Sequence, residues 1–421
     1  MKINELKEKK ILILGFGREG QDTFFFLKKL FPEKEFGIAD KNEIYFRDKN
    51  AKLFSGKDYL KTIKDYEVII KSPGIPIHLS EIEKASKEGR ITSQMEIFFE
   101  NCPGKIIGIT GTKGKSTTTS LIYKILKAGG LKAHLVGNIG KPVLSSLFGA
   151  KEKDVFVCEL SSHQLYNLKK SPDIAVLLNV YPEHLDYYKN IEEYSFAKAN
   201  IALYQKKGDY LVYGSKNKIV SEIAKKSKAK KIAVKGEYYD LDKASAKEVG
   251  KIFGIPEKII KKEIKNFTPL AHRLERIGEY RGIIFYNDAL ATIPEATIGA
   301  IKFLGKKVET IMLGGFERNI NFENLAKEVL RSRIKTVILF PTTGEKIWNE
   351  IILQSKGKNL PKNFSVENMR DAVRLAYLNT ARGKICLLST ASSSFSIFRD
   401  FKEKGNLFKK YVKQFARQKF K

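Results

Sequence analysis

Short apolar runs alternate with longer stretches of helical character from one end of the chain to the other. Each run is a few residues long, rich in Ile, Val, Leu and Phe, and bounded by polar, Gly or Pro residues, which predicts a buried strand. Strands that alternate with helices are typical of parallel α/β sheets. Helices at about Lys57–Asp65 and after Ser116 would supply crossovers. The predicted strands are Ile11–Leu14, Phe36–Ala39, Glu67–Lys71, Lys105–Thr110, Val155–Cys158, Ile174–Leu178, Ile283–Tyr286, Thr310–Leu313, Thr336–Phe340 and Lys384–Leu388.

Two segments that contain Pro or Gly interrupt this series, Asn101–Gly104 and Asn266–Leu270. Such residues favour breaks between folded segments. A chain of 421 residues can bury more than one core. We therefore expect three α/β domains, at residues 1–96, 97–269 and 270–421.

The charge balance is strongly basic, with 77 Lys and Arg against 47 Asp and Glu and a formal net charge of +30. Such an excess favours anionic partners. The lysines are spread along the whole chain and interleaved with acids, so a solvated surface on a protein with anionic substrates is favoured over a nucleic-acid-binding site. Three widely spaced cysteines show no metal-binding pattern, which predicts reduced thiols.

Neither a membrane span nor a leader peptide is predicted. No apolar run approaches the roughly 18 residues that a membrane span needs. The apolar run that follows the charged start is too short for a signal-peptide core. We expect a soluble, cytoplasmic protein.

The strongest single motif is Gly108–Ser116, at the end of a predicted strand and the start of a predicted helix. Backbone N–H groups of such a loop surround phosphate oxygens, Lys115 would reach the terminal phosphates, and the Ser116 hydroxyl would face Mg²⁺. The general phosphate-loop pattern places a glycine at position 109, which is Ile109 here. A glycine-rich turn without a ligand is the alternative, but strand, Gly-Lys-Ser and helix in succession favour a nucleotide site.

A second glycine motif, Gly15–Gly20, follows the first strand, and Asp40 ends the next one. This spacing is typical of dinucleotide-binding folds. Because the domain is small and the chain also carries a phosphate loop, a nucleotide diphosphate is favoured over NAD. An NAD-dependent oxidoreductase remains an alternative.

Two further polar segments stand at strand ends, Glu159–His163 and Asn179–Asp186. Open α/β sheets bind ligands at this edge. A carboxylate and an imidazole beside a phosphate loop could share one Mg²⁺, which makes His184 a candidate ligand. Lys198 has the spacing of an ordinary surface lysine.

Taken in order, the motifs resemble those of the Mur ligase family along nearly the whole chain. The motifs are Ser72–Ile75, Thr110–Ser116, Gly137–Gly140, Glu159–Ser162, Asn179–Asp186, Ala197–Lys198, His272–Glu275, Asn287–Asp288, Gly314–Gly315 and Leu388–Phe395.

The resemblance implies three domains: a Rossmann-like N-terminal domain, a central phosphate-loop ATPase domain with a mostly parallel sheet, and a Rossmann-like C-terminal domain. It also implies an ATP-dependent acid–amino-acid ligase of peptidoglycan precursor synthesis. The expected reaction adds D-glutamate to UDP-N-acetylmuramoyl-L-alanine through an acyl phosphate. The expected partners are these small molecules and ATP with Mg²⁺ at two sites, and the expected state is a monomer without nucleic-acid or membrane partners.

The resemblance also implies site residues. The expected catalytic residues are Lys115, His184, Lys198, Arg273 and Asp288. ATP would contact Gly111, Thr112, Lys113, Gly114, Lys115, Ser116, Thr117, Asp242, Arg273 and Asp288. The UDP precursor would contact Gly15, Arg18, Asp40, Lys41, Ser72, Gly74 and Asn138, and the amino acid Thr292, Arg318, Ser394, Phe395 and Phe401. Mg²⁺ would be held by Ser116, Glu159, His184 and an N-carbamoylated Lys198, with an unmodified Lys198 that clamps a phosphate as the alternative.

Several positions depart from the family pattern. Leu290 stands where the family usually has a lysine, and Arg318 replaces another lysine. Tyr238–Asp242 differs from the usual adenine-side motif, and Thr390 and Ser396 replace the usual Pro and Asp. The alternatives left open are a Mur-like ligase with changed specificity, for L-glutamate or a folate-like acceptor, and a nucleic-acid-dependent phosphate-loop ATPase.

Overall fold

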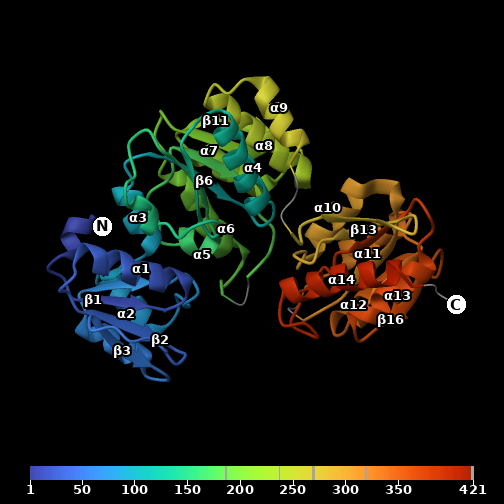
Figure 1. The fold of residues 1–421 in the computed structure, drawn as a ribbon, viewed down its shortest axis with the longest axis horizontal. Helices are drawn as coiled ribbons and strands as arrows, with labels where there is room; N and C mark the ends of the chain where they lie inside the picture. Colours follow the sequence, from blue (N-terminus) through green and yellow to red (C-terminus); the bar gives the residue numbers. More distant parts are fainter. Residues whose placement is uncertain (185–186, 237, 268–270, 318–319, 419–421) are drawn as a thin grey trace. The chain divides into compact units, whose positions relative to one another are not determined.

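The computed structural model describes residues 1–184, 187–236, 238–267, 271–317 and 320–418. The chain forms two compact units (Figure 1). The first unit contains residues 1–236 and 240–266, and the second contains residues 237–239 and 267–421.

The first unit begins with a five-stranded parallel sheet of order β3-β2-β1-β4-β5. Its central strand β1 is fully buried, because helix α1 packs Phe24 and Leu27 on one face while a second apolar cluster covers the other. The elements are η1 (Ile3–Leu6), β1 (Ile11–Leu14), α1 (Arg18–Leu30), β2 (Phe36–Asp40), β3 (Ala51–Ser55), η2 (Tyr59–Asp65), β4 (Val68–Lys71), α2 (Ser80–Lys87) and β5 (Ile91–Thr92).

A six-stranded parallel sheet of order β11-β10-β9-β6-β8-β7 forms the rest of this unit. Helix α4 packs on β6, β7 and β8, and α6 packs on β6 and β9. The elements are α3 (Gln94–Asn101), β6 (Lys105–Thr110), α4 (Lys115–Ala128), β7 (Ala133–Gly137), η3 (Ser145–Leu147), β8 (Val155–Glu159), α5 (Ser162–Leu165), β9 (Ile174–Leu177), α6 (Ile191–Leu203), β10 (Tyr210–Gly214), α7 (Lys218–Lys226), β11 (Lys230–Val234), α8 (Tyr238–Ile252) and α9 (Glu257–Lys265).

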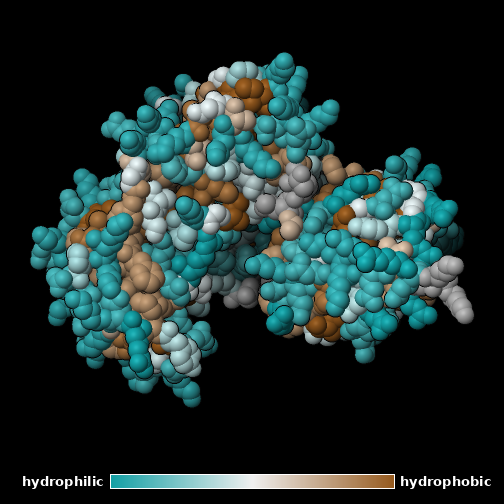
Figure 2. Space-filling view, viewed as in Figure 1, coloured by the Kyte–Doolittle hydropathy of each residue, from teal (hydrophilic) through white to brown (hydrophobic). Residues whose placement is uncertain are grey.

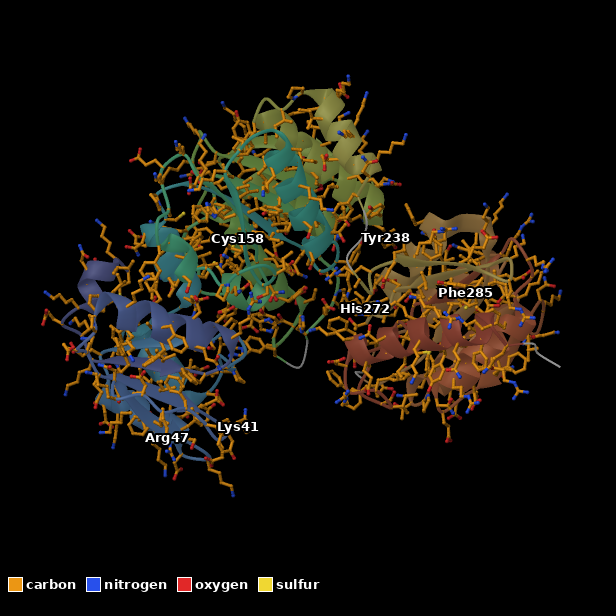
Figure 3. The ribbon with its side chains drawn as sticks, in the orientation of Figure 1. Lys41, Arg47, Cys158, Tyr238, His272 and Phe285 are labelled. Atoms are coloured by element: carbon orange, nitrogen blue, oxygen red, sulfur yellow. The ribbon has the colours of Figure 1, made fainter. Side chains whose placement is uncertain are left out.

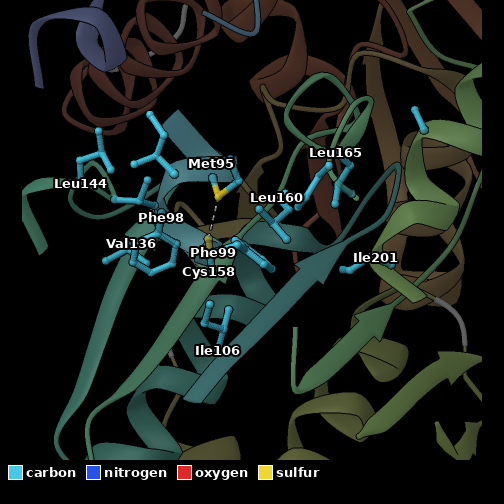
Figure 4. Packing of buried hydrophobic residues seen from close by; sticks show 14 of the residues in the cluster. Met95, Phe98, Phe99, Ile106, Val136, Leu144, Cys158, Leu160, Leu165 and Ile201 are labelled. Carbon is cyan, nitrogen blue, oxygen red and sulfur yellow. Dashed lines mark hydrogen bonds between the residues drawn. The ribbon is translucent and has the colours of Figure 1, made fainter. Parts of the chain in front are cut away.

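One apolar core is shared by these two sheets. Helix α3 carries Met95 and Phe98 into it, where Phe98 packs edge-on against Phe156 at 5.5 Å and Met95 contacts Cys158 (Figure 4). This continuous core explains why both sheets belong to one compact unit. The expected boundary between residues 96 and 97 falls inside α3, and the boundary at 269–270 lies outside the described residues. The three-domain boundaries stay a prediction.

The second unit holds a six-stranded sheet of order β12-β13-β17-β14-β15-β16. Only β12 and β13 pair antiparallel among its described strands. One core lies under α13 and α14 and another under α10, α11 and α12, so both faces are covered. The elements are β12 (Glu275–Tyr280), β13 (Ile283–Asn287), α10 (Pro294–Leu304), η4 (Gly305–Lys307), β14 (Val308–Leu313), α11 (Glu323–Arg331), β15 (Thr336–Leu339), α12 (Thr343–Ser355), β16 (Lys362–Ser365), α13 (Met369–Asn379), β17 (Ile385–Leu388) and α14 (Phe401–Ala416).

The predicted α/β class with mostly parallel sheets is confirmed. Each predicted strand is present within one or two residues of its expected ends, whereas the helix expected at Lys57–Asp65 is a 3₁₀ helix over Tyr59–Asp65. Hydrophilic side chains cover most of the visible face of each unit (Figure 2). Among the described residues, no helix combines the length and the apolar character needed to span a bilayer.

Candidate active site

The phosphate loop connects the buried end of β6 to the first turn of α4. Gly114, which precedes α4, has φ +87°, a conformation that favours glycine. A Cβ atom at Gly114 would also lie 2.1 Å from Asp242 Oδ1. Gly108 has a different role, since a Cβ there would meet Pro172 and Leu160 at 2.8 and 2.9 Å. Gly108, which stands one position before the glycine of the general phosphate-loop pattern, therefore allows close packing of β6.

Asn179, which follows β9, fixes the shape of the loop. Its Oδ1 accepts a hydrogen bond of 2.8 Å from the Lys113 backbone N–H, and its Nδ2 donates to the Lys113 carbonyl at 3.1 Å. The Thr112 N–H donates to the Asn179 carbonyl at 2.8 Å. The sequence analysis included Asn179 in its motif but assigned it no role. Its partners are backbone groups of the loop, which residue types do not indicate.

Lys115 bends back over the same loop. Its Nζ donates to the carbonyls of Gly111 at 2.8 Å and Thr112 at 3.0 Å. The amine is thus held beside the backbone N–H groups that open α4, where a helix N-terminus favours anions. This arrangement suits a terminal phosphate.

Glu159 ends β8, next to β6, and pairs in register with Ile109. It is 1% exposed. Its Oε1 accepts a hydrogen bond of 2.9 Å from Asn138 Nδ2, while its buried Oε2 has no hydrogen-bond partner among the described residues. A buried carboxylate oxygen without a partner is costly unless a ligand satisfies it, and it is a donor that Mg²⁺ prefers. Ser116, also buried, supplies a hydroxyl oxygen in the first turn of α4.

The segment after β9 brings a second set of charges to the loop. Lys113 Nζ forms an ion pair of 2.9 Å with Glu183 Oε1. Burial opposes ionisation of Glu183, but the charges of Lys113, Lys115 and His184 outweigh it and lower the pKa of Glu183 to about 2. His184 itself has φ +59° and stacks edge-on against His163 at 4.9 Å. Glu183 is therefore a charged member of the site that the sequence motif contained but did not distinguish.

Lys198 lies in α6 and is only 1% exposed. Its spacing in the sequence had been that of a surface lysine. Its Nζ lies 4.8 Å from the Tyr194 ring centroid and donates to the Gly111 carbonyl at 3.1 Å. Burial, with the nearby charge of Lys115, lowers the pKa of the Lys198 amine well below its usual range. Burial therefore favours the neutral amine, the form in which a lysine is nucleophilic.

A separate pocket of about 400 Å³ lies at the carboxyl ends of β1 and β4. Gly15 approaches Ser72 closely: a Cβ there would lie 2.7 Å from Ser72 Cβ, and Ser72 Oγ donates to the Gly15 carbonyl at 2.9 Å. Asp40 Oδ2 accepts from the Phe16 N–H at 2.7 Å. The structure brings to this pocket Gly15, Arg18, Asp40, Ser72, Gly74 and Asn138.

Lys41 differs from the other expected precursor ligands, because it is exposed and does not line this pocket (Figure 3). Arg18, at the start of α1, donates from its guanidinium to the Gly140 carbonyl. Arg18 thereby links the first glycine motif to the Gly137–Gly140 motif of the second sheet.

Asp242 and Thr117 complete the expected ATP ligands of the first unit, and both are buried. Asp242 Oδ1 accepts a hydrogen bond of 3.0 Å from Thr118 Oγ1. Asp242 therefore braces the phosphate loop from α8.

The second unit contains the remaining expected residues. Asp288 accepts hydrogen bonds from the Leu274 N–H at 3.1 Å and from Ser389 Oγ at 2.9 Å. Arg273 and Thr292 lie in loops before β12 and α10. Ser394 is buried, and its Oγ has no hydrogen-bond partner among the described residues.

Two aromatic residues of the expected amino-acid site differ in burial. Phe395 is 58% exposed, whereas Phe401 begins α14 with its ring 5.9 Å from that of His272, which Figure 3 labels. Arg318 lies outside the described residues. Lys404, on the same helix, is buried and donates to Thr390 Oγ1 at 2.6 Å. No pattern in the sequence indicated this burial.

Within the described ranges no three Asp, Glu, His or Cys side chains gather in a metal-binding cluster. The fitting oxygen donors are instead the Glu159 carboxylate and the Ser116 hydroxyl.

Comparison with known proteins agrees with this geometry. The Mur ligase middle domain matches residues 109–267. The UDP-N-acetylmuramoylalanine–D-glutamate ligases of Acetivibrio thermocellus and Clostridium acetobutylicum are 34% and 36% identical, each comparison covering 97% of both chains.

Solved structures share the fold. The MurF ligase of Thermotoga maritima in complex with ADP matches with a TM-score of 0.60 and 15% identity, over 98% of this chain and 97% of that one. The MurC ligase of the same organism matches with a TM-score of 0.58 and 15% identity, over 98% and 100%. With relatives above 30% identity along almost its whole length, the chain belongs to the Mur ligase family.

Proposed function

We propose that this protein is the ATP-dependent ligase that joins D-glutamate to UDP-N-acetylmuramoyl-L-alanine in peptidoglycan precursor synthesis. The two relatives at 34% and 36% identity are UDP-N-acetylmuramoylalanine–D-glutamate ligases, and the similarity covers 97% of each. The observation that carries the proposal is the phosphate loop. Within one compact unit it collects Lys115, Lys198 and a Glu159 oxygen that has no hydrogen-bond partner among the described residues. The enzyme acts in the cytoplasm, where ATP is available, as a monomer that needs no nucleic-acid or membrane partner.

The first step is phosphoryl transfer. A carboxylate oxygen of the precursor attacks the γ-phosphorus of ATP, the bond to the β-phosphate oxygen breaks, and ADP leaves with that electron pair. Lys115 and the N–H groups of Gly111–Ser116 hold the transferring group in line. Positioning and charge neutralisation dominate such reactions, because little covalent chemistry falls to the protein.

The second step forms the amide. The amine of glutamate attacks the acyl carbon, a tetrahedral intermediate forms, and phosphate leaves as the amine loses a proton. The proposed amino-acid ligands are Thr292, Ser394, Phe395 and Phe401. The Ser394 hydroxyl, which has no hydrogen-bond partner in the part of the chain that the structure describes, is a donor suited to a substrate carboxylate. Arg318 stays a prediction for the same role.

Nucleotide binding involves further residues of both units. We assign Thr112, Lys113, Gly114 and Thr117 to the phosphates through the loop, and Asp242 to bracing that loop. Arg273 and Asp288 of the second unit are proposed as catalytic nucleotide ligands. The proposed contacts in the precursor pocket are Gly15, Arg18, Asp40, Ser72, Gly74 and Asn138. Lys41, which does not line the pocket, stays a prediction.

Mg²⁺ would be held by Ser116 and Glu159 at one position and by His184 and Lys198 at a second. When bound, the ion neutralises charge on the phosphates. The neutral Lys198 amine is able to add carbon dioxide, with loss of one proton, to give an N-carbamate. That change converts a nitrogen donor into the oxygen ligand that a hard cation prefers.

A substrate comparison tests the proposal. ATP-dependent phosphate release should require UDP-N-acetylmuramoyl-L-alanine and D-glutamate together, and L-glutamate should give little release. A preference for L-glutamate would identify a Mur ligase of changed specificity, which Leu290 in place of a lysine makes the main alternative. Equal release with and without the precursor would overturn the cell-wall assignment, and stimulation by DNA would favour a nucleic-acid-dependent ATPase.

A further inference from the structure

The loop Ser72–Ile75 forms one wall of the 400 Å³ precursor pocket. The carbonyls of Ser72, Pro73 and Ile75 accept hydrogen bonds from side chains. Lys71 Nζ donates to the carbonyls of Ser72 at 3.1 Å and Ile75 at 2.9 Å. Lys71 is itself buried at the end of β4, so this side of the loop is anchored within the first sheet.

A tyrosine from the other sheet holds the same loop. The Tyr187 hydroxyl donates to the Ile75 carbonyl at 3.1 Å and shares its hydrogen with the Pro73 carbonyl at 3.3 Å. Tyr187 stands in the segment after β9, 112 residues beyond Ile75. The Ile75 carbonyl therefore accepts from both sheets of the first unit.

The other side of Tyr187 faces His184. The Tyr187 backbone N–H donates to the His184 carbonyl at 3.0 Å, and His184 itself has a φ of +59°. The Tyr187 ring packs edge-on against His163 at 4.2 Å, and His163 packs against His184 at 4.9 Å. Tyr187 thus contacts the loop Ser72–Ile75 with its hydroxyl, His184 with its backbone N–H, and His163 with its ring.

We propose that Tyr187 is a positioning residue that couples occupation of the precursor pocket to the placement of His184 beside the phosphate loop. The inference rests on the proposed function for the identity of the two ligands. A precursor that orders Ser72–Ile75 would fix the acceptors of the Tyr187 hydroxyl and so, through the backbone of Tyr187 and the His163 ring, restrict the position of His184. Such coupling is reciprocal, so nucleotide bound near His184 would tighten precursor binding by the same factor.

The test compares Tyr187→Phe with Tyr166→Phe. Tyr166 belongs to the same aromatic cluster, 6.1 Å from Tyr188, and its hydroxyl also makes one strong hydrogen bond, of 2.8 Å to Glu193. Among the described residues its hydroxyl makes no hydrogen bond to Ser72–Ile75, so Tyr166→Phe controls for the loss of a tyrosine hydroxyl from this cluster. Calorimetry would measure AMPPNP affinity in the presence of Mg²⁺, with and without saturating UDP-N-acetylmuramoyl-L-alanine.

We expect the precursor to tighten AMPPNP binding about threefold to tenfold in the wild type and in Tyr166→Phe, the range of one neutral hydrogen bond. In Tyr187→Phe this factor should fall towards one, while AMPPNP affinity without the precursor stays unchanged. A wild-type factor of one, or an undiminished factor in Tyr187→Phe, would overturn the inference. Coupling that persists in an enzyme inactive with D-glutamate would instead refute only the proposed substrate.

Discussion

Thr118 Oγ1 donates a 3.0 Å hydrogen bond to Asp242 Oδ1, 124 residues further along the chain. This bond connects the N-terminal end of α4 to α8. Both residues are buried. The same carboxylate oxygen occupies the space that a side chain at Gly114 would need. Asp242 thus packs against the phosphate loop at Gly114 and supports it. The sequence analysis expected Asp242 only as an ATP ligand.

Gly114→Ala should therefore destabilise the first unit and abolish AMPPNP binding. The substitution combines a left-handed backbone with a clash against Asp242, for which we expect a loss of about 2–4 kcal/mol in the free energy of unfolding. Urea denaturation followed by circular dichroism measures it. Gly130→Ala is the matched control, because Gly130 has a similar φ of +82° but no neighbour within 4 Å. Equal losses in both variants would contradict the clash.

Lys115→Ala should lower kcat by at least about 10³-fold, since it removes the cation held over the phosphate loop. Affinity for UDP-N-acetylmuramoyl-L-alanine should stay within about twofold of wild type, because the precursor pocket has a different lining. Lys127→Ala, an exposed lysine on the same helix, is the control. Retention of full turnover by Lys115→Ala would refute the assignment.

Lys198→Ala should be strongly impaired and partly rescued by small carboxylates such as acetate or formate. The physical reason is that a carboxylate can replace the oxygens of a carbamate in the space that the side chain vacates. Wild-type activity should also fall in buffers freed of carbon dioxide and return with bicarbonate. Crystallographic density for a bare amine in the active, Mg²⁺-loaded enzyme would exclude the carbamate.

Lys404→Met should stabilise the second unit, and the gain should depend on pH. Burial, opposed in part by the charge of Asp288, lowers the pKa of Lys404 from 10.5 to about 7. Between these values the unfolded chain binds a proton that the folded chain has released, so wild-type stability rises with pH through this window. The gain of Lys404→Met, about 1–3 kcal/mol after loss of the Thr390 hydrogen bond, should be full below pH 7 and vanish towards pH 10.5.

The single tryptophan of the chain, Trp348 in α12, makes this measurement specific to the second unit. Its fluorescence during urea denaturation at pH 6.5 and pH 9.5 gives the two free energies. Lys402→Met, an exposed position on the same helix, should show no such pH dependence. A gain of equal size at both pH values would argue against a buried charge as its cause.

The strands that the sequence predicted are those with continuous apolar runs, such as β1 and β6. Strands missed lie mostly at sheet edges, where β3, β11 and β16 expose much of their length and carry mixed side chains. Local composition cannot distinguish such strands from loops, because the hydrogen bonds of a neighbouring strand hold them in place.

Prediction of the site followed the same division. The loop Gly111–Ser116 and the Gly15–Gly20 turn could be located from the sequence because backbone–phosphate contacts demand glycines at fixed spacing, and the ligands of both stay predictions. The burial of Lys198 was not, since only the packing of α6 against β6 and β9 removes this lysine from solvent. The contacts of Tyr187 could not be predicted either, because its partners lie on a loop more than a hundred residues away in the sequence.

Because Lys115 already donates to two carbonyls of its own loop, most of its rotational freedom is lost when the protein folds. Immobilising a lysine costs up to about 2 kcal/mol of side-chain entropy. Because this entropy is lost on folding, ATP binding does not have to order the side chain again. The affinity for ATP is therefore higher than it would be with a mobile lysine at this position.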